Sequence, residues 1–340
     1  MNSVEGKELA SELARLAEHR NAVLDEIARA VVGQEKVLEL MVAALLARGH
    51  CLLVGVPGLA KTQMAKALSG SLDLSFKRVQ FTPDLMPSDI TGTNVIYDLP
   101  EGGREFRFVP GPVFANIVLA DEINRTPPKT QAAMLEAMQE RQVSVAQKTY
   151  ELEPPFLVIA TQNPIEQEGT YELPEAQLDR FMFDVHVEYP PLAQEEEILA
   201  ATSAQDEPPR TSPVMSREEV LAAQKLVRRV AISNFVVSYV ARIIRSTRPD
   251  DELSPKFVKE FVEWGVGPRG GQLLILGAKA LAAMDGRPGV SAADIRRAAV
   301  PALRHRVATN FQAQAEGIDS VDIVRRLLES IPEPKVPKYG

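Results

Sequence analysis

Apolar residues change their spacing along the chain near residue 190. Before that position, continuous apolar runs of strand length alternate with segments in which apolar residues recur every three or four positions. Such runs are typical of parallel strands buried on both faces, and the recurring spacing is typical of amphipathic helices. The predicted strands are 50–54, 76–81, 116–122, 156–163 and 181–187. The predicted helices are 5–30, 35–47, 63–68, 130–141 and 175–181. Residues 1–190 are therefore predicted to form an α/β domain around a parallel sheet.

After residue 190 the helical spacing continues without strand-like runs. The helices predicted there are 195–201, 217–230, 235–245, 272–284, 292–307 and 321–331. Ser291, followed three positions later by Asp294, is typical of a helix N-cap. Proline-rich stretches at 206–213 and 332–337 predict a loop and a tail. Residues 191–340 are thus predicted to form an all-α domain that ends in a tail.

Two segments of the first domain depart from this alternation. Residues 84–114 are rich in proline and glycine, and the alternating pattern at 104–108 predicts an ordered β-excursion inside them. A long insertion in a compact domain is usually functional. Residues 142–152 alternate around a turn at Gln147-Lys148, which predicts a β-hairpin.

The composition is that of an ordinary soluble protein with an acidic balance. The net charge of −8 and the sequence pI of about 5.3 do not favour nucleic acid as a partner. The single cysteine, Cys51, excludes an intrachain disulfide and lies in an apolar run, so we expect it to be buried. The first residues lack the pattern of a signal peptide, and no apolar stretch reaches the length of a membrane span. We therefore expect a cytoplasmic protein.

The first strand leads into a glycine-rich loop, Gly55-Val56-Pro57-Gly58-Leu59-Ala60-Lys61-Thr62, and a helix follows. Strand, loop and helix in this order are the context of a phosphate-binding loop, or P-loop. Its backbone N–H groups and the helix N-terminus attract phosphate. Lys61 is predicted to reach the β- and γ-phosphates, and the Thr62 hydroxyl is predicted to bind Mg²⁺. Ala60 replaces the last glycine of the usual pattern, which favours a negative φ at this position.

Polar side chains follow two other predicted strands. Asp121 and Glu122 end one strand, and Asn163 ends another. Ligands bind beyond the carboxyl ends of parallel strands, so these residues are predicted to lie beside the P-loop. Asp121 is placed to hold Mg²⁺ through water, Glu122 to orient or deprotonate the attacking water, and Asn163 to contact the γ-phosphate or that water. Gln34, in the break between the first two helices, would lie near the nucleotide base, although a simple helix-linking turn explains that break equally well.

These motifs resemble those of AAA+ ATPases, and within that class the chain resembles the MoxR family over nearly its full length. The motifs that carry the resemblance are Val32-Gly33-Gln34, Gly55 to Thr62, Asp121 to Arg125 with Pro127-Pro128-Lys129, Glu136-Ala137-Met138, Ala160 to Pro164, Glu175 to Phe181 and Gly267 to Gly270. Ala60 in the P-loop is itself usual in MoxR sequences.

The resemblance implies a role for each motif in binding ATP and Mg²⁺. Asp121 and Glu122 would be Walker B, Asn163 would be sensor 1, and Thr62 and Asp121 would bind the metal. Arg180 would be the arginine finger that reaches a neighbouring subunit, with Arg125 as its rival, and Arg269 would be sensor 2, reaching the nucleotide in cis. The nucleotide-binding residues would be Gly33, Gln34, Gly55, Val56, Pro57, Gly58, Leu59, Ala60, Lys61, Thr62 and Gln63.

At the level of the whole protein, the resemblance implies an AAA+ core followed by a helical lid. Residues 84–114 would be the helix-2 insertion and residues 142–152 the pre-sensor-1 hairpin. It further implies a hexameric ring with chaperone-like action on a client or adaptor protein, often one with a von Willebrand factor A domain. Two alternatives are a nucleotide-gated scaffold with little turnover and a nucleic-acid motor. Glu122, Asn163, Arg180 and Arg269 speak against the scaffold, and the acidic balance speaks against the motor.

Overall fold

The computed structural model describes residues 3–98, 100, 103–146, 148–165, 169–204 and 209–334. The predicted loop 206–213 and tail 332–337 therefore lie partly outside the described residues, as does Gln147 of the predicted hairpin turn.

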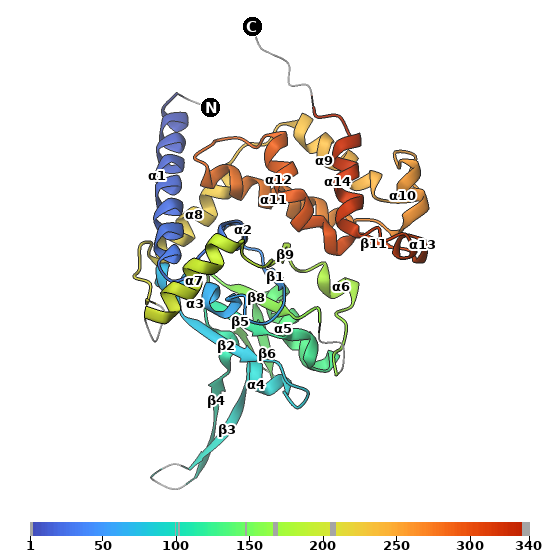
Figure 1. Cartoon of the computed structure of the whole chain (residues 1–340). Helices are drawn as coiled ribbons and strands as arrows, with labels where there is room; N and C mark the ends of the chain where they lie inside the picture. The colour runs from blue at the N-terminus through green and yellow to red at the C-terminus, as the bar shows by residue number, and fades with distance from the viewer. Residues whose placement is uncertain are drawn as a thin grey trace.

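A parallel sheet of five strands forms the centre of the first domain (Figure 1). Its order is β2-β5-β8-β1-β9, and each neighbouring pair is parallel. The strands are β1 (Cys51–Val54), β2 (Phe76–Gln80), β5 (Ile117–Asp121), β8 (Leu157–Gln162) and β9 (Phe183–His186). The predicted parallel sheet is confirmed, and all its strands end at one edge.

The strands are buried on both faces, which explains their continuous apolar runs. In β5, Ile117 and Leu119 belong to one core cluster, whereas Val118 and Ala120 belong to the other. The first face is covered by α1 (Ser3–Ala28), α2 (Glu35–Leu46), α3 (Lys61–Ser71) and the lid helices. The second is covered by α4 (Pro87–Thr91), η1 (Pro112–Phe114), α5 (Pro128–Glu140) and the hairpin of β6 (Gln142–Val145) and β7 (Lys148–Glu151). Cys51 is fully buried, as predicted.

The insertion is more regular than its composition indicates. After α4 it forms an antiparallel hairpin of β3 (Gly92–Asp98) and β4 (Arg104–Pro110), which projects from the body of the molecule (Figure 1). Gly92 has φ +89°, and a side chain there would collide with the Val109 carbonyl. Phe108 stacks on Tyr150 of β7 with ring centroids 4.0 Å apart, so the two hairpins support each other.

The lid, residues 217–334, is helical as predicted. Its helices are α8 (Arg217–Arg229), α9 (Asn234–Ser246), α10 (Lys256–Phe261), α11 (Pro268–Met284), α12 (Ala292–Leu303), α13 (Phe311–Ala315) and α14 (Ser320–Ser330), with the 3₁₀ turn η3 (Arg304–Arg306). The predicted cap at Ser291 is a capping box with Asp294. The sequence pattern missed α10, α13 and one short antiparallel pair, β10 (Val262–Trp264) with β11 (Ala308–Thr309), because such short elements show no period.

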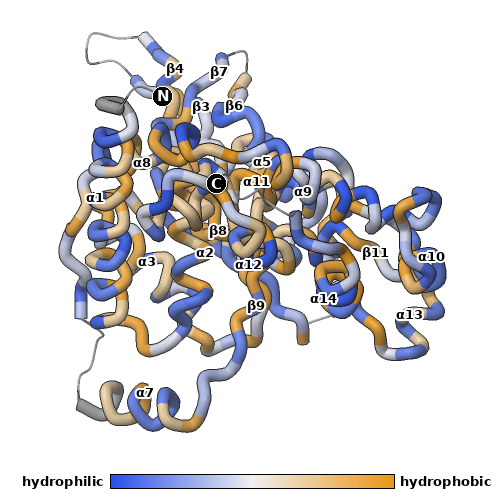
Figure 2. Tube along the Cα trace, turned by 90° about the horizontal axis from the view of Figure 1, so that it is seen from above, coloured by the Kyte–Doolittle hydropathy of each residue, from blue (hydrophilic) through white to orange (hydrophobic). Residues whose placement is uncertain are grey.

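Two short elements belong to the core: η2 (Ile123–Arg125) follows β5, and α6 (Glu175–Leu178) precedes β9. The connection from core to lid contains α7 (Leu192–Ala204). Seen from above, α7 lies apart from the main body (Figure 2). None of the described helices is both long enough and apolar enough to cross a bilayer.

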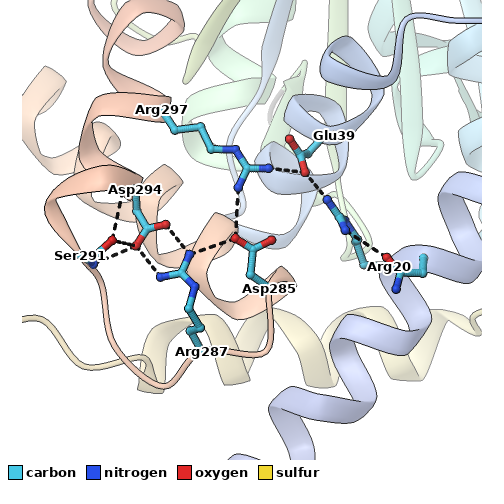
Figure 3. A network of polar contacts seen from close by, with 8 residues as sticks. Arg20, Glu39, Asp285, Arg287, Ser291, Asp294 and Arg297 are labelled. Atoms are coloured by element: carbon cyan, nitrogen blue, oxygen red, sulfur yellow. Dashed lines mark hydrogen bonds and ion pairs between the residues drawn. The ribbon is translucent and has the colours of Figure 1, made fainter.

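The lid packs closely on the core. A single cluster of buried apolar residues runs from α1 and the sheet into the lid helices. Gly277 of α11 lies so near the sheet that an added Cβ would come within 2.6 Å of the Phe183 ring. At the rim, Glu39 of α2 accepts ion pairs from Arg20 of α1 and Arg297 of α12, and Arg297 also reaches Asp285 (Figure 3). Apolar and ionic contacts thus both link the two parts.

Candidate nucleotide-binding site

The P-loop lies between β1 and α3 and lines a cleft of about 440 Å³ at the carboxyl edge of the sheet. At its start, the Gly55 N–H donates to Gln162 O at 3.2 Å, and an added Cβ would come within 2.8 Å of Val187 O. Gly58 has φ +86°, which favours glycine. The cleft is lined by Pro57, Gly58, Leu59, Ala60, Lys61, Thr62, Gln63, Arg78, Asp121, Glu122, Thr161 and Asn163. The strand ends therefore meet the P-loop, as the sequence predicted.

The predicted negative φ at Ala60 is wrong. Ala60 is left-handed, with φ 55° and ψ 19°, and is the N-cap residue of α3. Its carbonyl accepts the Met64 N–H at 2.8 Å, which begins the helix. A left-handed alanine costs about 1–2 kcal/mol. The loop therefore keeps the backbone turn that a glycine would give, because the packing of the strand before it and the helix after it fixes both ends.

Lys61 extends along the P-loop into the cleft. Its Nζ donates to the Gly55 carbonyl and, at 3.2 Å, to the Val56 carbonyl. Burial lowers the pKa of Lys61, while the carboxylates of Asp121 and Glu122 oppose that shift. The amine thus binds two neutral carbonyls and lies close to two carboxylates. From this position it can exchange the carbonyls for phosphate oxygens.

Asp121 is buried at the end of β5. Its Oδ1 accepts the Thr161 hydroxyl at 2.6 Å, and its Oδ2 accepts Nε and Nη2 of Arg78 at 2.9 and 2.7 Å. These partners come from the two strands beside β5. Sequence reasoning missed Thr161 and Arg78, because their contacts depend on strand register. The one feature of the sequence that could have indicated them is that each is a polar residue near the end of a predicted strand.

Glu122 begins the turn after β5 with a left-handed backbone, φ 56°. Its N–H donates to Thr161 Oγ1 at 2.8 Å, which fixes the start of the side chain. The carboxylate Oε2 accepts Gln80 Nε2 at 2.7 Å and Arg125 Nη1 at 3.1 Å. Glu122 is therefore held at the cleft wall by two side chains, of which Gln80 was not predicted.

Asn163 follows β8 and is 4% exposed. Its Oδ1 accepts the Ile165 N–H at 3.2 Å, whereas its buried Nδ2 has no hydrogen-bond partner among the described residues. Buried amides are normally paired. Because Asn163 lines the cleft beside the P-loop, this unpaired donor fits an oxygen of a bound phosphate or a water molecule.

The donor set of the cleft also fits Mg²⁺. Thr62 and Asp121 both line it, and Mg²⁺ is usually bound through one or two protein groups together with substrate phosphates and waters. No cluster of three or more His, Cys, Asp or Glu side chains suited to a metal exists elsewhere in the described ranges. The metal assignment of Thr62 and Asp121 remains a prediction.

Gly33 and Gln34 form a left-handed pair between α1 and α2, with φ 72° and 63°. The Gln34 side chain donates to Glu188 O at 2.9 Å. A side chain on Gly33 would collide with Gln194. These contacts place the pair beside the chain that leaves β9, next to Val187 and hence near the start of the P-loop. The pair also links two helices, so its role at the base remains a prediction.

The predicted arginines lie outside the residues that line the phosphate cleft. Arg180 follows α6 and is half-buried, and its Nε has no partner among the residues described. Arg269, in the first turn of α11, lies 3.6 Å from Asp179 Oδ2. Arg125 contacts Glu122 of its own subunit. The structure thus brings the P-loop, Asp121, Glu122 and Asn163 together, but not Arg180 or Arg269.

Comparison with known proteins assigns the family. A model of the ATPase family associated with various cellular activities (AAA) matches residues 50–183, and an AAA lid domain model matches residues 256–327. The chaperone MoxR1 of Mycobacterium tuberculosis is 41% identical over 318 residues, which cover 93% of this chain and 83% of that protein. The chain belongs to the MoxR family of AAA ATPases.

A second MoxR protein and a solved ATPase structure agree with this assignment. Protein MoxR of Methylorubrum extorquens is 31% identical over 327 residues, covering 91% of this chain and 93% of that protein. A crystal structure of a protein from Cytophaga hutchinsonii has a TM-score of 0.90 at 38% identity and covers 98% of this chain and 100% of that one. The matched AAA segment includes the P-loop, Asp121, Glu122, Asn163 and Arg180, and the matched lid segment includes Arg269.

Proposed function

We propose that this MoxR-family protein hydrolyses ATP with Mg²⁺, and that it does so as a ring, with a hexamer as the expected assembly. The observation that supports this most directly is the unpaired, buried Nδ2 of Asn163 in the cleft that also contains Lys61 and Glu122. This donor set suits a triphosphate whose last phosphoryl group is transferred to water.

Each side chain of the cleft has a separate role in this proposal. Lys61 exchanges the Gly55 and Val56 carbonyls for the β- and γ-phosphate oxygens. Asn163 donates Nδ2–H to the γ-phosphate or to the attacking water. Glu122 orients and deprotonates that water after leaving Gln80 and Arg125. Thr62 and Asp121 would hold Mg²⁺, whose charge would offset that of the phosphates.

The site is incomplete within one subunit, since no arginine but Arg78 lines the described cleft, and Arg78 is engaged with Asp121. We assign the missing cation to Arg180 of the neighbouring subunit. An arginine supplied in trans stabilises charge on the transferring phosphoryl group and contributes about 10³–10⁵ in rate in other enzymes. Turnover would then depend on assembly. Arg125 is the second choice because it already pairs with Glu122.

Client remodelling is the biological role that we propose for this cycle. One relative carries the name chaperone. The projecting β3–β4 hairpin exposes Ile96, Tyr97 and Phe106, a surface that suits contact with a polypeptide. The proposed partners are a client or an adaptor, which could carry a von Willebrand factor A domain, in the cytoplasm, where ATP is available. A hydrolysis cycle that leaves the core and lid in one arrangement would contradict this role.

The deciding experiment is ATP turnover per subunit against protein concentration, with mass measured by light scattering, for wild type, Arg180→Ala and Arg125→Ala. We expect turnover to rise with assembly and Arg180→Ala to lower it about 10³-fold while ATP still binds. Turnover that is independent of concentration, or an unaffected Arg180→Ala, would contradict the shared site. A larger loss in Arg125→Ala, with assembly intact, would assign the trans role to Arg125.

A further inference from the structure

A buried arginine of the lid holds the segment that carries Arg180. Arg306 ends η3, directly after α12, and its side chain is 2% exposed. Its Nε donates to Asp179 Oδ1 at 2.7 Å. Its Nη2 donates to the backbone carbonyls of Asp179 and Phe181, both at 2.7 Å. These two carbonyls lie on either side of Arg180 in the chain, so the guanidinium binds the backbone from which the Arg180 side chain begins.

The remaining nitrogen of this guanidinium, Nη1, binds the lid. Nη1 donates to the Ala302 carbonyl of α12. The stem packs under α11, since a Cβ added to Gly270 would lie 2.8 Å from Arg306 Cδ. Burial lowers the pKa of Arg306, and the Asp179 carboxylate opposes that shift. A buried cation without such partners would cost several kcal/mol, so Arg306 and Asp179 are expected to move together.

A second lid arginine reaches the same segment. Arg269 of α11 lies 3.6 Å from Asp179 Oδ2, the oxygen that Arg306 does not use. His305 Nε2 lies 3.1 Å from the Phe181 carbonyl. The lid therefore contacts the Arg180 segment through α11 and through η3. On the core side, Phe181 is fully buried, which leaves the backbone little freedom to shift independently.

We propose that Arg306 is a positioning residue that sets the location of Arg180, so that the lid of each subunit governs the arginine offered to its neighbour's cleft. This inference rests on the proposed function, in which Arg180 acts in trans. Because Phe181 is anchored in the core, a lid displacement that follows nucleotide binding in one subunit would shift Asp179 and Arg180 relative to it. The neighbour's hydrolysis would thereby respond to the first subunit's nucleotide.

The first test separates kcat from KM. Arg306→Gln removes the charge and the three bonds to the Arg180 segment but leaves the phosphate cleft intact. A misplacement of about 1 Å at a catalytic group can lower the rate about 10²-fold. We expect Arg306→Gln to lower kcat about 10–100-fold with an unchanged KM for ATP and an unchanged assembly mass. The matched control is Arg304→Gln, since Arg304 lies on the same turn but contacts His186 instead, and its kcat should stay within about twofold of wild type.

The second test mixes subunits. Glu122→Gln subunits have an intact Arg180 but no base, whereas Arg306→Gln subunits have an intact cleft but a misplaced Arg180. In mixed rings we expect turnover well above the sum of the two separate preparations, as for a mixture of Glu122→Gln with Arg180→Ala. The double variant Arg306→Gln/Arg180→Ala should be no slower than Arg180→Ala alone. A purely structural role of Arg306 would give no recovery on mixing.

The outcomes distinguish the inference from the function on which it rests. If Arg180→Ala lowers kcat but Arg306→Gln does not, the inference is wrong and the shared site stands. If Arg180→Ala has no effect, Arg180 is not the trans arginine and the inference loses its basis, whether or not Arg125 takes that role. If Arg306→Gln fails to assemble, Asp179→Asn decides, because it removes the carboxylate partner of Arg306 and keeps both backbone contacts; Arg269→Gln is its control, since Arg269 also pairs with this carboxylate. A three- to tenfold loss of kcat at constant KM, recovered on mixing, supports the inference, and an unchanged kcat contradicts it.

Discussion

The two edges of the central sheet carry polar side chains of opposite kinds. At the amino edge, His50 precedes β1 and Asn116 precedes β5, and the side-chain nitrogens and oxygens of both are paired. At the carboxyl edge, Asn163 has an unpaired buried amide, and Lys61 binds only carbonyls. The amino edge thus carries side chains with satisfied hydrogen bonds, whereas the carboxyl edge carries Lys61 and Asn163, which can still gain a ligand as partner. Buried polar groups with all partners in place stabilise the fold, whereas an unpaired one that also lines a cleft is a candidate ligand contact.

The largest effect is expected at the carboxyl edge from Glu122→Gln. The amide keeps the shape of the side chain but cannot accept a proton, and general base catalysis is worth about 10²–10⁴ in rate. We expect turnover to fall by that factor while ATP binding and unfolding temperature stay near those of wild type. Glu136→Gln, at an exposed position of α5, is the matched control for the loss of one carboxylate. Turnover of Glu122→Gln above one tenth of wild type would remove Glu122 from the chemistry.

At the amino edge, acid should act through His50. The Val158 N–H donates to its Nδ1 at 2.9 Å, and its Nε2 lies 3.1 Å from Met138 O, so the neutral ring fits and an added proton on Nδ1 would break a bond. Burial lowers the pKa of His50 to about 4. Between pH 6.5 and about 4 the unfolded chain binds the extra proton, so the free energy of unfolding falls as the pH falls, by about 3 kcal/mol in all.

A second buried group, Asp184, opposes this loss of stability at low pH. Burial raises the pKa of Asp184 to about 6, which adds stability as the pH falls from 6 towards 3.8. The pH dependence should therefore be measured as the difference between wild type and His50→Asn in denaturant unfolding, alongside an NMR titration of the imidazole. A His50 ring that titrates near pH 6.5 would contradict the assignment.

A matched pair of asparagines tests both edges at once. Asn163→Ala removes a donor that lacks a protein partner, so we expect turnover to fall about 10–100-fold with little change in unfolding free energy. Asn116→Ala removes the acceptor of the Ser75 O–H and N–H and the donor to the Pro155 carbonyl, which should cost about 1–3 kcal/mol of stability and spare turnover at low temperature. Denaturant unfolding and ATP turnover, measured for both variants, would show that one loses activity and the other loses stability. If both variants lost stability equally, the distinction between the two edges would fail.

The smallest effect is expected from Ala60→Gly. Glycine relieves a left-handed strain of about 1–2 kcal/mol, but its freer unfolded chain offsets about 0.5–1 kcal/mol of that gain. We expect a net stabilisation of about 0.5 kcal/mol in denaturant unfolding. Ala65→Gly, inside α3 with a helical backbone, should instead destabilise by about 1 kcal/mol. If both substitutions changed the unfolding free energy in the same direction, the left-handed geometry of Ala60 would be contradicted.

The sequence predicted the sheet, the P-loop and the strand ends because each follows from local pattern. A strand buried on both faces must be apolar throughout, as in β5, and parallel strands must end together, which brought Asp121 and Asn163 to Lys61. What it missed depends on contacts between distant segments. Gln80 reaches Glu122 only because β2 and β5 pair in one register.

Ala60 and Arg306 show two further limits. The negative φ expected at Ala60 rested on its side chain alone, whereas the packing of the whole strand–loop–helix unit fixes its backbone. Arg306 carried no signal beyond the run Arg304-His305-Arg306, since its partners lie more than 120 residues away across the docked lid. Burial of a charge is visible only after the chain has folded.

The continuous apolar cluster between core and lid limits how this subunit can change shape. Opening the lid about a flexible joint would expose the seam where Gly277 meets Phe183, at about 25 cal/mol per Å² of apolar surface. Packed helices that slide by about 1–2 Å keep such a seam closed, which is shear rather than hinge motion. In the proposed ATPase ring, each hydrolysis event would therefore deliver a short stroke, and larger displacements of a client would require many strokes added around that ring.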